Sequence, residues 1–426
     1  MSQWDNYPLY GSYDVVVIGG GTAGFAAGAS AARNGLKTLI VEELAFLGGT
    51  ATGGDVGVFF GFQKDETEEG LKGIVKDMFT KLKSKNGTPG LTTIYCLGLK
   101  DMDVPAAEYN DDLLKVVMDE IVEESGAQVL FHTKYIGVEK EGSKIKYILI
   151  HNTKGIQRVE AKVFVDASFH ASLAADAGVP FEVGNENGEL QPGTLMYKTG
   201  NVDFEQYRQF PIEERQALAR EGLATGELPV NFLLARQLQN GNVYHNQCRV
   251  MADPLEPENW SAAETAARKQ IYVIANWWKN HVPGFENSFM SSYSPFTGLR
   301  DSRRIIGKFV ITAEELMKGV RYEDTIAESS YPIDVHHADG RQDNTLIRPA
   351  EGTFYIPYRS LVTNEIDNLA VIGRCFSADY VAHAALRVTI CCMRMGEAVG
   401  YAARESIDSG IAMNALDGKL IHDKVF

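Results

Sequence analysis

The sequence is short of the residues that would build a disulfide framework or a membrane span. Its 426 residues hold only five cysteines, with no C-x-x-C, namely Cys96, Cys248, Cys375, Cys391 and Cys392. The adjacent Cys391 and Cys392 do not readily bridge to each other, so reduced thiols are expected. The chain opens without a basic segment followed by an apolar core, and no apolar run reaches the roughly 18 residues of a spanning helix. These absences predict a soluble, cytoplasmic protein.

Positive charge is scarce as well. Lysine and arginine number 41 against 56 aspartates and glutamates, which gives a formal net charge of −15. Nucleic acid and anionic membranes are therefore not expected as partners, because both require clustered cations. The length favours two joined domains, and a hydrophobic content of 45% is that of a globular enzyme. We expect a small-molecule substrate and no metal site, and a homo-oligomer only from the general frequency of such assemblies.

The strongest positive signal lies between residues 14 and 42. Val15–Ile18 is a short apolar run typical of a strand buried on both faces of a parallel sheet. Gly19, Gly21 and Gly24 follow as G-x-G-x-x-G and open an alanine-rich helix. The first glycine permits a tight turn, the second lets the backbone approach a pyrophosphate, and the third lets helix and strand touch. The pattern predicts a dinucleotide site at a helix N-terminus.

The end of the next strand supports the same interpretation. Leu36–Val41 is apolar and is followed by Glu42, which lies 18 residues beyond Gly24. An acid at this spacing is placed to bond a ribose hydroxyl. Because the position carries an acid and not an arginine, a 2′-phosphate and hence NADP are disfavoured.

Later segments decide between FAD and NAD. A helix is predicted over Asn110–Ser125 and a strand over Val129–His132, followed by strand-like runs at 135–139, 145–151 and 156–160 and a strand at Val163–Val165. Far downstream, Thr363 is followed after six residues by the apolar run 370–372 and Gly373. This order resembles the FAD-binding fold of the glutathione-reductase-like flavoproteins, in which a β-meander crossover separates the first unit from later strands.

More closely, the chain resembles the FAD-dependent oxidoreductase family nearly end to end. Blocks that carry the resemblance are GGGTAGFAAG at 19–28, FLGGTATGG at 46–54, VDAS at 165–168, GLRDSRRIIGKFVITAEELMKG at 298–319, YIPYRSL at 355–361 and the long block from 373 to 403. The resemblance implies an α/β fold with a parallel Rossmann-type FAD-binding sheet, a β-meander crossover and an inserted α+β substrate or cap domain. The FAD-binding domain would comprise 1–180 and 351–426, and the insertion 181–350.

The resemblance also implies the residues that contact FAD. These are Gly19, Gly21, Thr22, Ala23, Gly24, Glu42, Glu43, Gly49, Thr50, Ala167, Ser168, Gly373, Arg374 and Arg387. Three residues, at two places in the chain, depart from the family pattern. Phe169-His170 stands where the family usually has Gly-Asp, and Arg374 stands where it usually has Asp. His170 either contacts the flavin or is a local substitution.

Three further absences narrow the chemistry. No second G-x-G-x-x-G follows a strand between 60 and 426, so electrons would come from the substrate, a small diffusible donor or a protein partner. The first 95 residues contain no cysteine, which excludes a disulfide reductase with a redox pair beside the first flavin loop. The segment 46–54 has neither His nor Cys, so FAD is expected to be non-covalent.

The inserted segment supplies the remaining expectations. It should contain helices near 213–222 and 261–279, a strand over Arg303–Ile311 and a capping box at Thr312-x-x-Glu315. A helix is expected near Tyr380–His383, and the resemblance implies that its positive first turn faces the pyrimidine edge of the flavin. The candidate catalytic residues are Arg300, Arg304, Tyr355, His383 and Arg387.

The sequence thus predicts an FAD-dependent oxidoreductase that transfers hydride between a small organic substrate and flavin N5, with a His or Tyr handling the proton. Two alternatives stay open. One is a flavin-dependent reductase of an activated C=C bond, and the other is a flavoprotein whose FAD is structural or a sensor.

Overall fold

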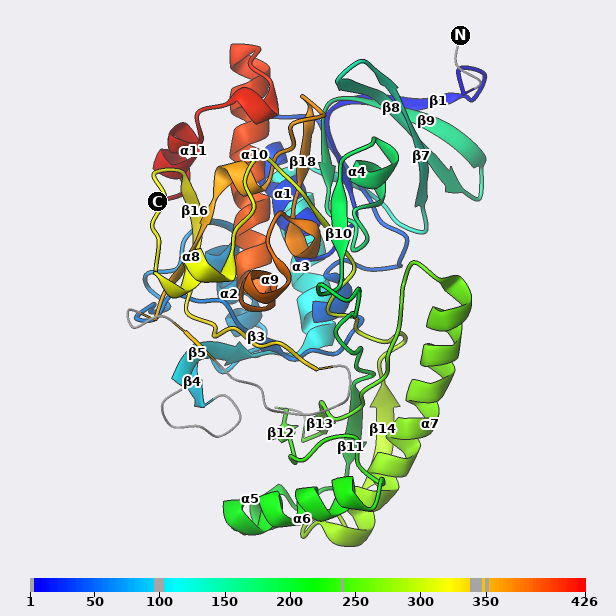
Figure 1. Cartoon of the computed structure of the whole chain (residues 1–426), viewed down its shortest axis with the longest axis vertical. Helices are drawn as coiled ribbons and strands as arrows, with labels where there is room; N and C mark the ends of the chain where they lie inside the picture. Colours follow the sequence, from blue (N-terminus) through cyan, green and yellow to red (C-terminus); the bar gives the residue numbers. More distant parts are fainter. Residues whose placement is uncertain (1–3, 96–102, 239–240, 338–346, 349–351) are drawn as a thin grey trace.

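A seven-stranded mixed sheet forms the centre of the upper half of the molecule in Figure 1. The structure is a computed structural model that describes residues 4–95, 103–238, 241–337, 347–348 and 352–426. The strands run in the order β6-β2-β1-β9-β8-β7, with β18 also beside β9. Their bounds are β1 (Leu9–Ile18), β2 (Thr38–Val41), β6 (Gln128–Leu130), β7 (Lys134–Glu141), β8 (Lys144–Asn152), β9 (Gly155–Asp166) and β18 (Leu369–Val371).

Strand β9 belongs to both parts of this sheet. It runs parallel to β1 from Arg158 to Asp166, antiparallel to β8 in its first half and parallel to β18 in its second half. The predicted runs 156–160 and 163–165 are therefore one strand, because β1 pairs with both of them. The β7-β8-β9 meander lies where the sequence indicated it.

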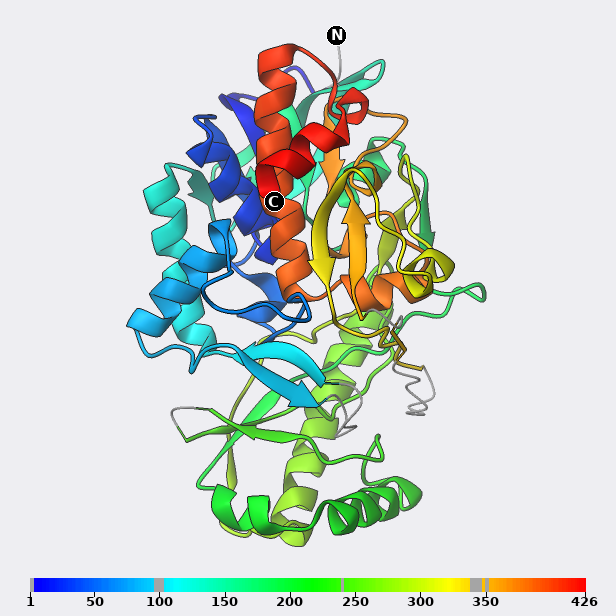
Figure 2. The same ribbon diagram turned by 90° about the vertical axis from the view of Figure 1, so that its left-hand side faces the viewer.

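Helices cover the sheet, and two of them approach each other very closely. The helices are α1 (Thr22–Arg33), α2 (Gly73–Ser84), α3 (Asp111–Ser125) and α10 (Thr389–Ser409). The close pair is α1 and α10, which lie side by side in Figure 2. A Cβ on Gly396 would lie 2.1 Å from the Ala23 carbonyl oxygen, and one on Gly400 would lie 2.3 Å from Ser30 Oγ. The two glycines thus let the last long helix pack directly onto the first. The helix predicted over 110–125 is confirmed as α3, which Asn110 caps.

A second sheet and three helices occupy the lower half of Figure 1. The sheet is antiparallel in the order β12-β13-β11-β14. Its strands and the neighbouring helices are β11 (Tyr197–Gly200), β12 (Ala235–Gln237), β13 (Val243–His245), β14 (Phe289–Tyr293), α5 (Phe204–Gln209), α6 (Ile212–Ala224) and α7 (Pro257–His281). Tyr197, Trp278 and Phe285 are buried in a core of their own there. The two helices predicted in this segment are confirmed as α6 and α7, whereas the domain division at 181 and 351 stays a prediction.

The remaining strands and helices are short. The strands are β3 (Val58–Phe59), β4 (Thr92–Tyr95), β5 (Asp103–Glu108), β10 (Phe181–Val183), β15 (Arg303–Ile305), β16 (Thr325–Ser329) and β17 (Phe354–Pro357). The helices are α4 (Ser172–Asp176), α8 (Ala313–Met317), α9 (Tyr380–Leu386) and α11 (Gly418–Val425). No helix in the described part of the chain is long and apolar enough to cross a membrane.

The strand predicted over Arg303–Ile311 is wrong beyond Ile305. Its partner β10 has only three residues, and after it the backbone amides find other acceptors. Gly307 N donates to Ser377 Oγ and Lys308 N to the carbonyl of Val362. The predicted capping box is confirmed, since Thr312 and Glu315 bond each other's backbone amides at the start of α8.

Candidate functional site

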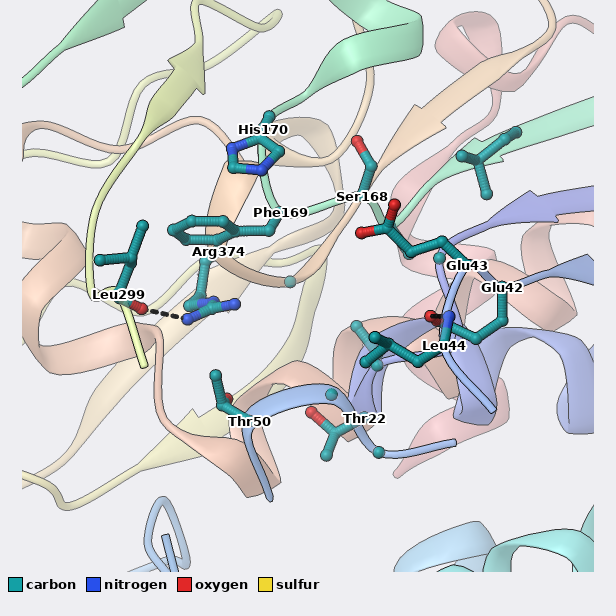
Figure 3. Close-up of a pocket in the computed structure, with 18 of the residues that line it drawn as sticks. Thr22, Glu42, Glu43, Leu44, Thr50, Ser168, Phe169, His170, Leu299 and Arg374 are labelled. Carbon is teal, nitrogen blue, oxygen red and sulfur yellow. Dashed lines mark hydrogen bonds between the residues drawn. The ribbon is translucent and has the colours of Figure 1, made fainter. Parts of the chain in front are cut away.

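A cavity of about 450 Å³ opens at the carboxyl ends of the parallel strands (Figure 3). Ile18, Val41 and Ala167, from the ends of β1, β2 and β9, line one side. Ligands of open α/β sheets bind at this edge, and the volume is that of a small-molecule or cofactor site.

The glycines of the first loop have separate structural tasks. Gly19 adopts φ +94°, and a Cβ there would lie 2.6 Å from the carbonyl oxygen of Ala167. A Cβ on Gly24 would lie 1.8 Å from the Gly19 oxygen, so this position is closed by the fold itself. Gly21 differs, because no protein atom lies within 4 Å of where its Cβ would be. The open space beside Gly21 belongs to the cavity, and it leaves room for a ligand to touch the backbone.

Helix α1 presents its first turn to this space. Thr22 and Ala23 line the cavity, no side chain caps the helix, and its first turn holds no acid. The first amides and the positive end of the helix dipole therefore suit an anionic group. The site fits the diphosphate of a dinucleotide.

Two acids follow β2 at the rim of the same space. Glu42 is buried, and its Oε2 and Oε1 accept from Gly20 N at 2.5 Å and Leu44 N at 2.7 Å. Burial raises the pKa of Glu42, while those two amides act in the opposite direction. Glu43 lines the cavity but is exposed, and its Oε2 lies 3.5 Å from Lys134 Nζ. Glu42 thus ties the glycine loop to the end of β2 as well as lining the cavity.

Of the fourteen residues predicted to contact the cofactor, thirteen line the cavity. These are Gly19, Gly21, Thr22, Ala23, Glu42, Glu43, Gly49, Thr50, Ala167, Ser168, Gly373, Arg374 and Arg387. Gly24 does not line it, because it lies where α1 presses on the loop.

Two of the three residues that depart from the family pattern, Phe169 and Arg374, contact each other at the far end of the cavity (Figure 3). The Arg374 guanidinium lies 4.0 Å from the centroid of the Phe169 ring and donates to the carbonyl of Leu299. His170 lies beside Phe169, with Nδ1 3.2 Å from Ser302 Oγ. Burial, together with Arg374 and Arg303, lowers the pKa of His170 to about 4. A cation–π pair therefore stands where the family pattern has glycine and aspartate.

The predicted catalytic residues are dispersed differently from our expectation. Arg387 lines the cavity, whereas Arg300, Arg304, Tyr355 and His383 do not. The backbone carbonyl of Arg300 accepts from Arg387. Arg387 and Arg304 lie close enough to His383 to help lower its pKa. Tyr355 is in β17, where its hydroxyl accepts from Arg321 Nε at 2.7 Å.

Their bonds show what these side chains do in the fold. Arg304, 1% exposed, pairs with Asp301 at 2.9 Å and donates to the Gly184 carbonyl at 2.8 Å. His383 is fully buried, and its Nε2 lies 2.8 Å from the carbonyl oxygen of Arg374. Burial holds the pKa of His383 well below its usual range. Both side chains join loops behind the cavity wall.

The helix that faces the cavity is not the one we expected. The first turn of α9 is capped by Asp379, whose Oδ1 accepts from Ala382 N, and none of Tyr380–His383 lines the cavity. Instead Thr389 and Cys392, in the first turn of α10, line it. The break between the two helices at Arg387 and Val388 was not visible as a change in composition.

Sequence reasoning also missed lining residues from outside the motifs. Thr133, Lys134 and Tyr135 follow β6, and the signal for them was the position of that strand in the parallel sheet. A largely apolar wall is completed by Trp260, Phe296, Thr297 and Leu299. No local motif marks the first three, whereas Leu299 lies in the block 298–319.

The family described as FAD dependent oxidoreductase matches residues 14–425. Thiamine thiazole synthase from Methanococcus vannielii is 31% identical over 181 residues, which are 42% of this chain and 62% of that protein. Dihydrolipoyl dehydrogenase from Trypanosoma brucei brucei is 52% identical over 44 residues, 10% of this chain and 9% of that one. The chain thus spans less than two thirds of either curated relative.

Solved structures show the same fold at low identity. A geranylgeranyl bacteriochlorophyll reductase-like protein from Thermoplasma acidophilum superposes with a TM-score of 0.51 at 17% identity. The match covers 97% of this chain and 82% of that protein's chain. The p-nitrophenol 4-monooxygenase of Pseudomonas putida gives 0.53 at 12% identity, covering 96% and 84%. The family match over nearly the whole chain, on a site that fits a dinucleotide, shows that this protein belongs to the FAD-dependent oxidoreductase family and is an enzyme whose cofactor is FAD.

Proposed function

We propose that the enzyme transfers hydride between a carbon of a small organic substrate and N5 of FAD held in the cavity. The observation that carries the proposal is the composition of the cavity, which joins an anion-binding glycine loop to a far end with an apolar wall and two arginines. Bound FAD supplies the hydride-transfer chemistry, and the protein supplies binding, orientation and electrostatics.

At the nucleotide end, the residues bind and orient. The first amides of α1, at Thr22 and Ala23, would hold the diphosphate. Glu42 would accept from the ribose hydroxyls with the lone pairs that its two backbone contacts leave over. Both groups are fixed by the fold before the cofactor arrives.

At the far end, positive charge would face the flavin ring. The first turn of α10 at Thr389 and the guanidinium of Arg387 would stabilise negative charge that develops there on hydride uptake. Trp260, Phe296 and Leu299 would exclude water from the substrate.

His170 would accept a hydrogen bond from a substrate hydroxyl. It is the one histidine among the described residues that line the cavity. Because its pKa is lowered to about 4, the ring is neutral at pH 7 and can accept a hydrogen bond. It is accordingly a weak base, which suits orientation of an O–H group better than full proton removal.

Anaerobic mixing of the holoenzyme with a panel of alcohols, amines and hydroxy acids tests the proposal. Bleaching of the flavin absorption by one class, faster than for free FAD with the same compounds, supports it. If no donor bleaches the flavin but enoates reoxidise the chemically reduced enzyme, the protein is a C=C reductase. If neither happens, the FAD is structural or a sensor and the proposal fails.

A further inference from the structure

Three arginines from distant segments meet beside the apolar wall, and one of them, Arg387, also lines the cavity. Arg249 Nη1 and Arg300 Nη1 donate to the same atom, Thr194 Oγ1, at 2.8 and 2.9 Å. Arg387 Nη1 donates to the carbonyl oxygen of Arg300 at 3.0 Å. The backbones of Thr194 and Gly298 exchange hydrogen bonds of 3.0 and 2.8 Å, which places this arginine cluster beside the wall segment 296–299.

The arginine cluster has more positive than negative charge. No ion pair joins Arg249, Arg300 or Arg387 to a carboxylate within the described ranges; their polar contacts are carbonyl, hydroxyl and amide oxygens. Asp334 accepts a hydrogen bond from Arg387 through its backbone oxygen, and its carboxylate bonds His336 and Tyr331. The Asp301 carboxylate also acts on Arg387, but it is paired with Arg304. Three guanidinium groups therefore share the field of two carboxylates that already have other partners.

Like charges held this close are costly inside a protein, and an anionic ligand would offset that cost. Burial, and then Arg249 and Arg387, holds the pKa of Arg300 well below its usual range. Burial lowers the pKa of Arg249 to about 10. All three arginines nevertheless keep part of their surface accessible, so they are not sealed in the core.

The chemistry of the missing partner follows from the surroundings. Guanidinium forks match planar, two-oxygen anions and bind them through charge-assisted hydrogen bonds. The adjoining wall of Trp260, Phe296 and Leu299 is apolar and suits the body of an organic molecule. An organic acid satisfies both requirements, whereas inorganic phosphate satisfies only the first.

We infer that the arginine cluster is a carboxylate-binding subsite, which anchors an organic acid with its apolar body against the wall and toward the cavity. The inference deepens the proposed function by assigning the substrate class, and it rests on that proposal for the oxidation step. The binding itself does not depend on turnover.

The test titrates the holoenzyme with benzoate and, in parallel, with benzamide, acetate and inorganic phosphate. Binding is read as heat in calorimetry and as a shift of the bound flavin's absorption spectrum. Benzoate should bind measurably and more tightly than the three comparison compounds. Arg300→Met and Arg249→Met should each weaken benzoate about ten- to a hundredfold, the effect of one charge-assisted hydrogen bond.

Arg208→Met is the matched control, because Arg208 is 69% exposed in α5 and should leave benzoate affinity unchanged. Thr194→Val keeps all three charges and removes only the shared hydroxyl, and it should weaken benzoate about tenfold even if an arginine variant fails to fold. Equal binding of benzoate and benzamide, or unchanged affinity in Thr194→Val and a folded Arg300→Met, overturns the subsite.

The two proposals fail separately. If benzoate binds as expected but no carboxylate substrate reduces the flavin, the subsite stands and hydride transfer fails. If neutral alcohols or amines reduce the flavin and benzoate neither binds nor competes, hydride transfer stands and the subsite fails.

Discussion

Alanine at Gly21 and alanine at Gly24 should have opposite effects, although both glycines belong to one motif. A Cβ at Gly21 meets no protein atom within 4 Å, and the residue has φ −59°, which alanine adopts easily. The poorer N-cap costs a few tenths to about 1 kcal/mol, and the stiffer unfolded chain returns about 0.4–1 kcal/mol. The free energy of unfolding of FAD-free Gly21→Ala should therefore lie within about 0.5 kcal/mol of wild type.

The added methyl group would instead occupy space that the cofactor uses. Overpacking of this kind costs about 1–3 kcal/mol, or roughly ten- to a hundredfold in the dissociation constant of FAD. Gly24→Ala places its Cβ 1.8 Å from the Gly19 oxygen, so it should destabilise the apoprotein by about 3 kcal/mol or more.

Urea unfolding of both apoproteins and fluorescence titration with FAD measure the two effects. The reasoning is refuted if Gly21→Ala binds FAD as wild type does, or if Gly24→Ala leaves the apoprotein as stable as before.

Three further expectations follow. Glu42→Ala should weaken the binding of FAD about ten- to a hundredfold and also lower the stability of the apoprotein, since two backbone amides lose their acceptor. The control Glu43→Ala, at an exposed position, should lose less FAD affinity. Equal losses of affinity in FAD titrations of the two variants would contradict this. Acid denaturation should release unmodified FAD, because 44–60 holds no His or Cys; flavin that stays on the chain in a denaturing gel would show a covalent link. The pKa of His170 is about 4 in the folded protein against 6.5 in the unfolded chain, so the folded state binds fewer protons between these pH values. The free energy of unfolding should therefore be highest above pH 6.5 and fall by about 3 kcal/mol toward pH 4. In His170→Gln, urea unfolding across this range should show a smaller fall, and an unchanged pH dependence would assign the loss to other groups.

The nucleotide end could be predicted because its signals are local. The glycine spacing, the strand before it and the acid after the next strand all lie within residues 14–42, and each is required by backbone geometry at its own position. The strand predicted over Arg303–Ile311 failed for the opposite reason. Its length was set by a three-residue partner from another segment, and composition carries no information about that partner.

The far end of the cavity was only partly predictable. A buried arginine that ties loops, as Arg304 does with Asp301, looks the same in sequence as one that lines the cavity, as Arg387 does. The contact between Phe169 and Arg374 joins positions about 200 residues apart. Both were recognised as departures from the family pattern, but their pairing is a property of the folded chain.

The close packing of α10 on α1 has a consequence for the order of events during synthesis. Roughly 350 residues lie between Arg33, the last residue of α1, and Thr389, the first of α10. A ribosome that adds about 5–20 residues per second needs about 20–70 s to make that stretch, during which the face of α1 that α10 will cover has no partner. Gly373, Arg387 and Cys392 are also late residues of the cavity lining. FAD therefore finds its complete binding surface only after the chain has been made through Cys392.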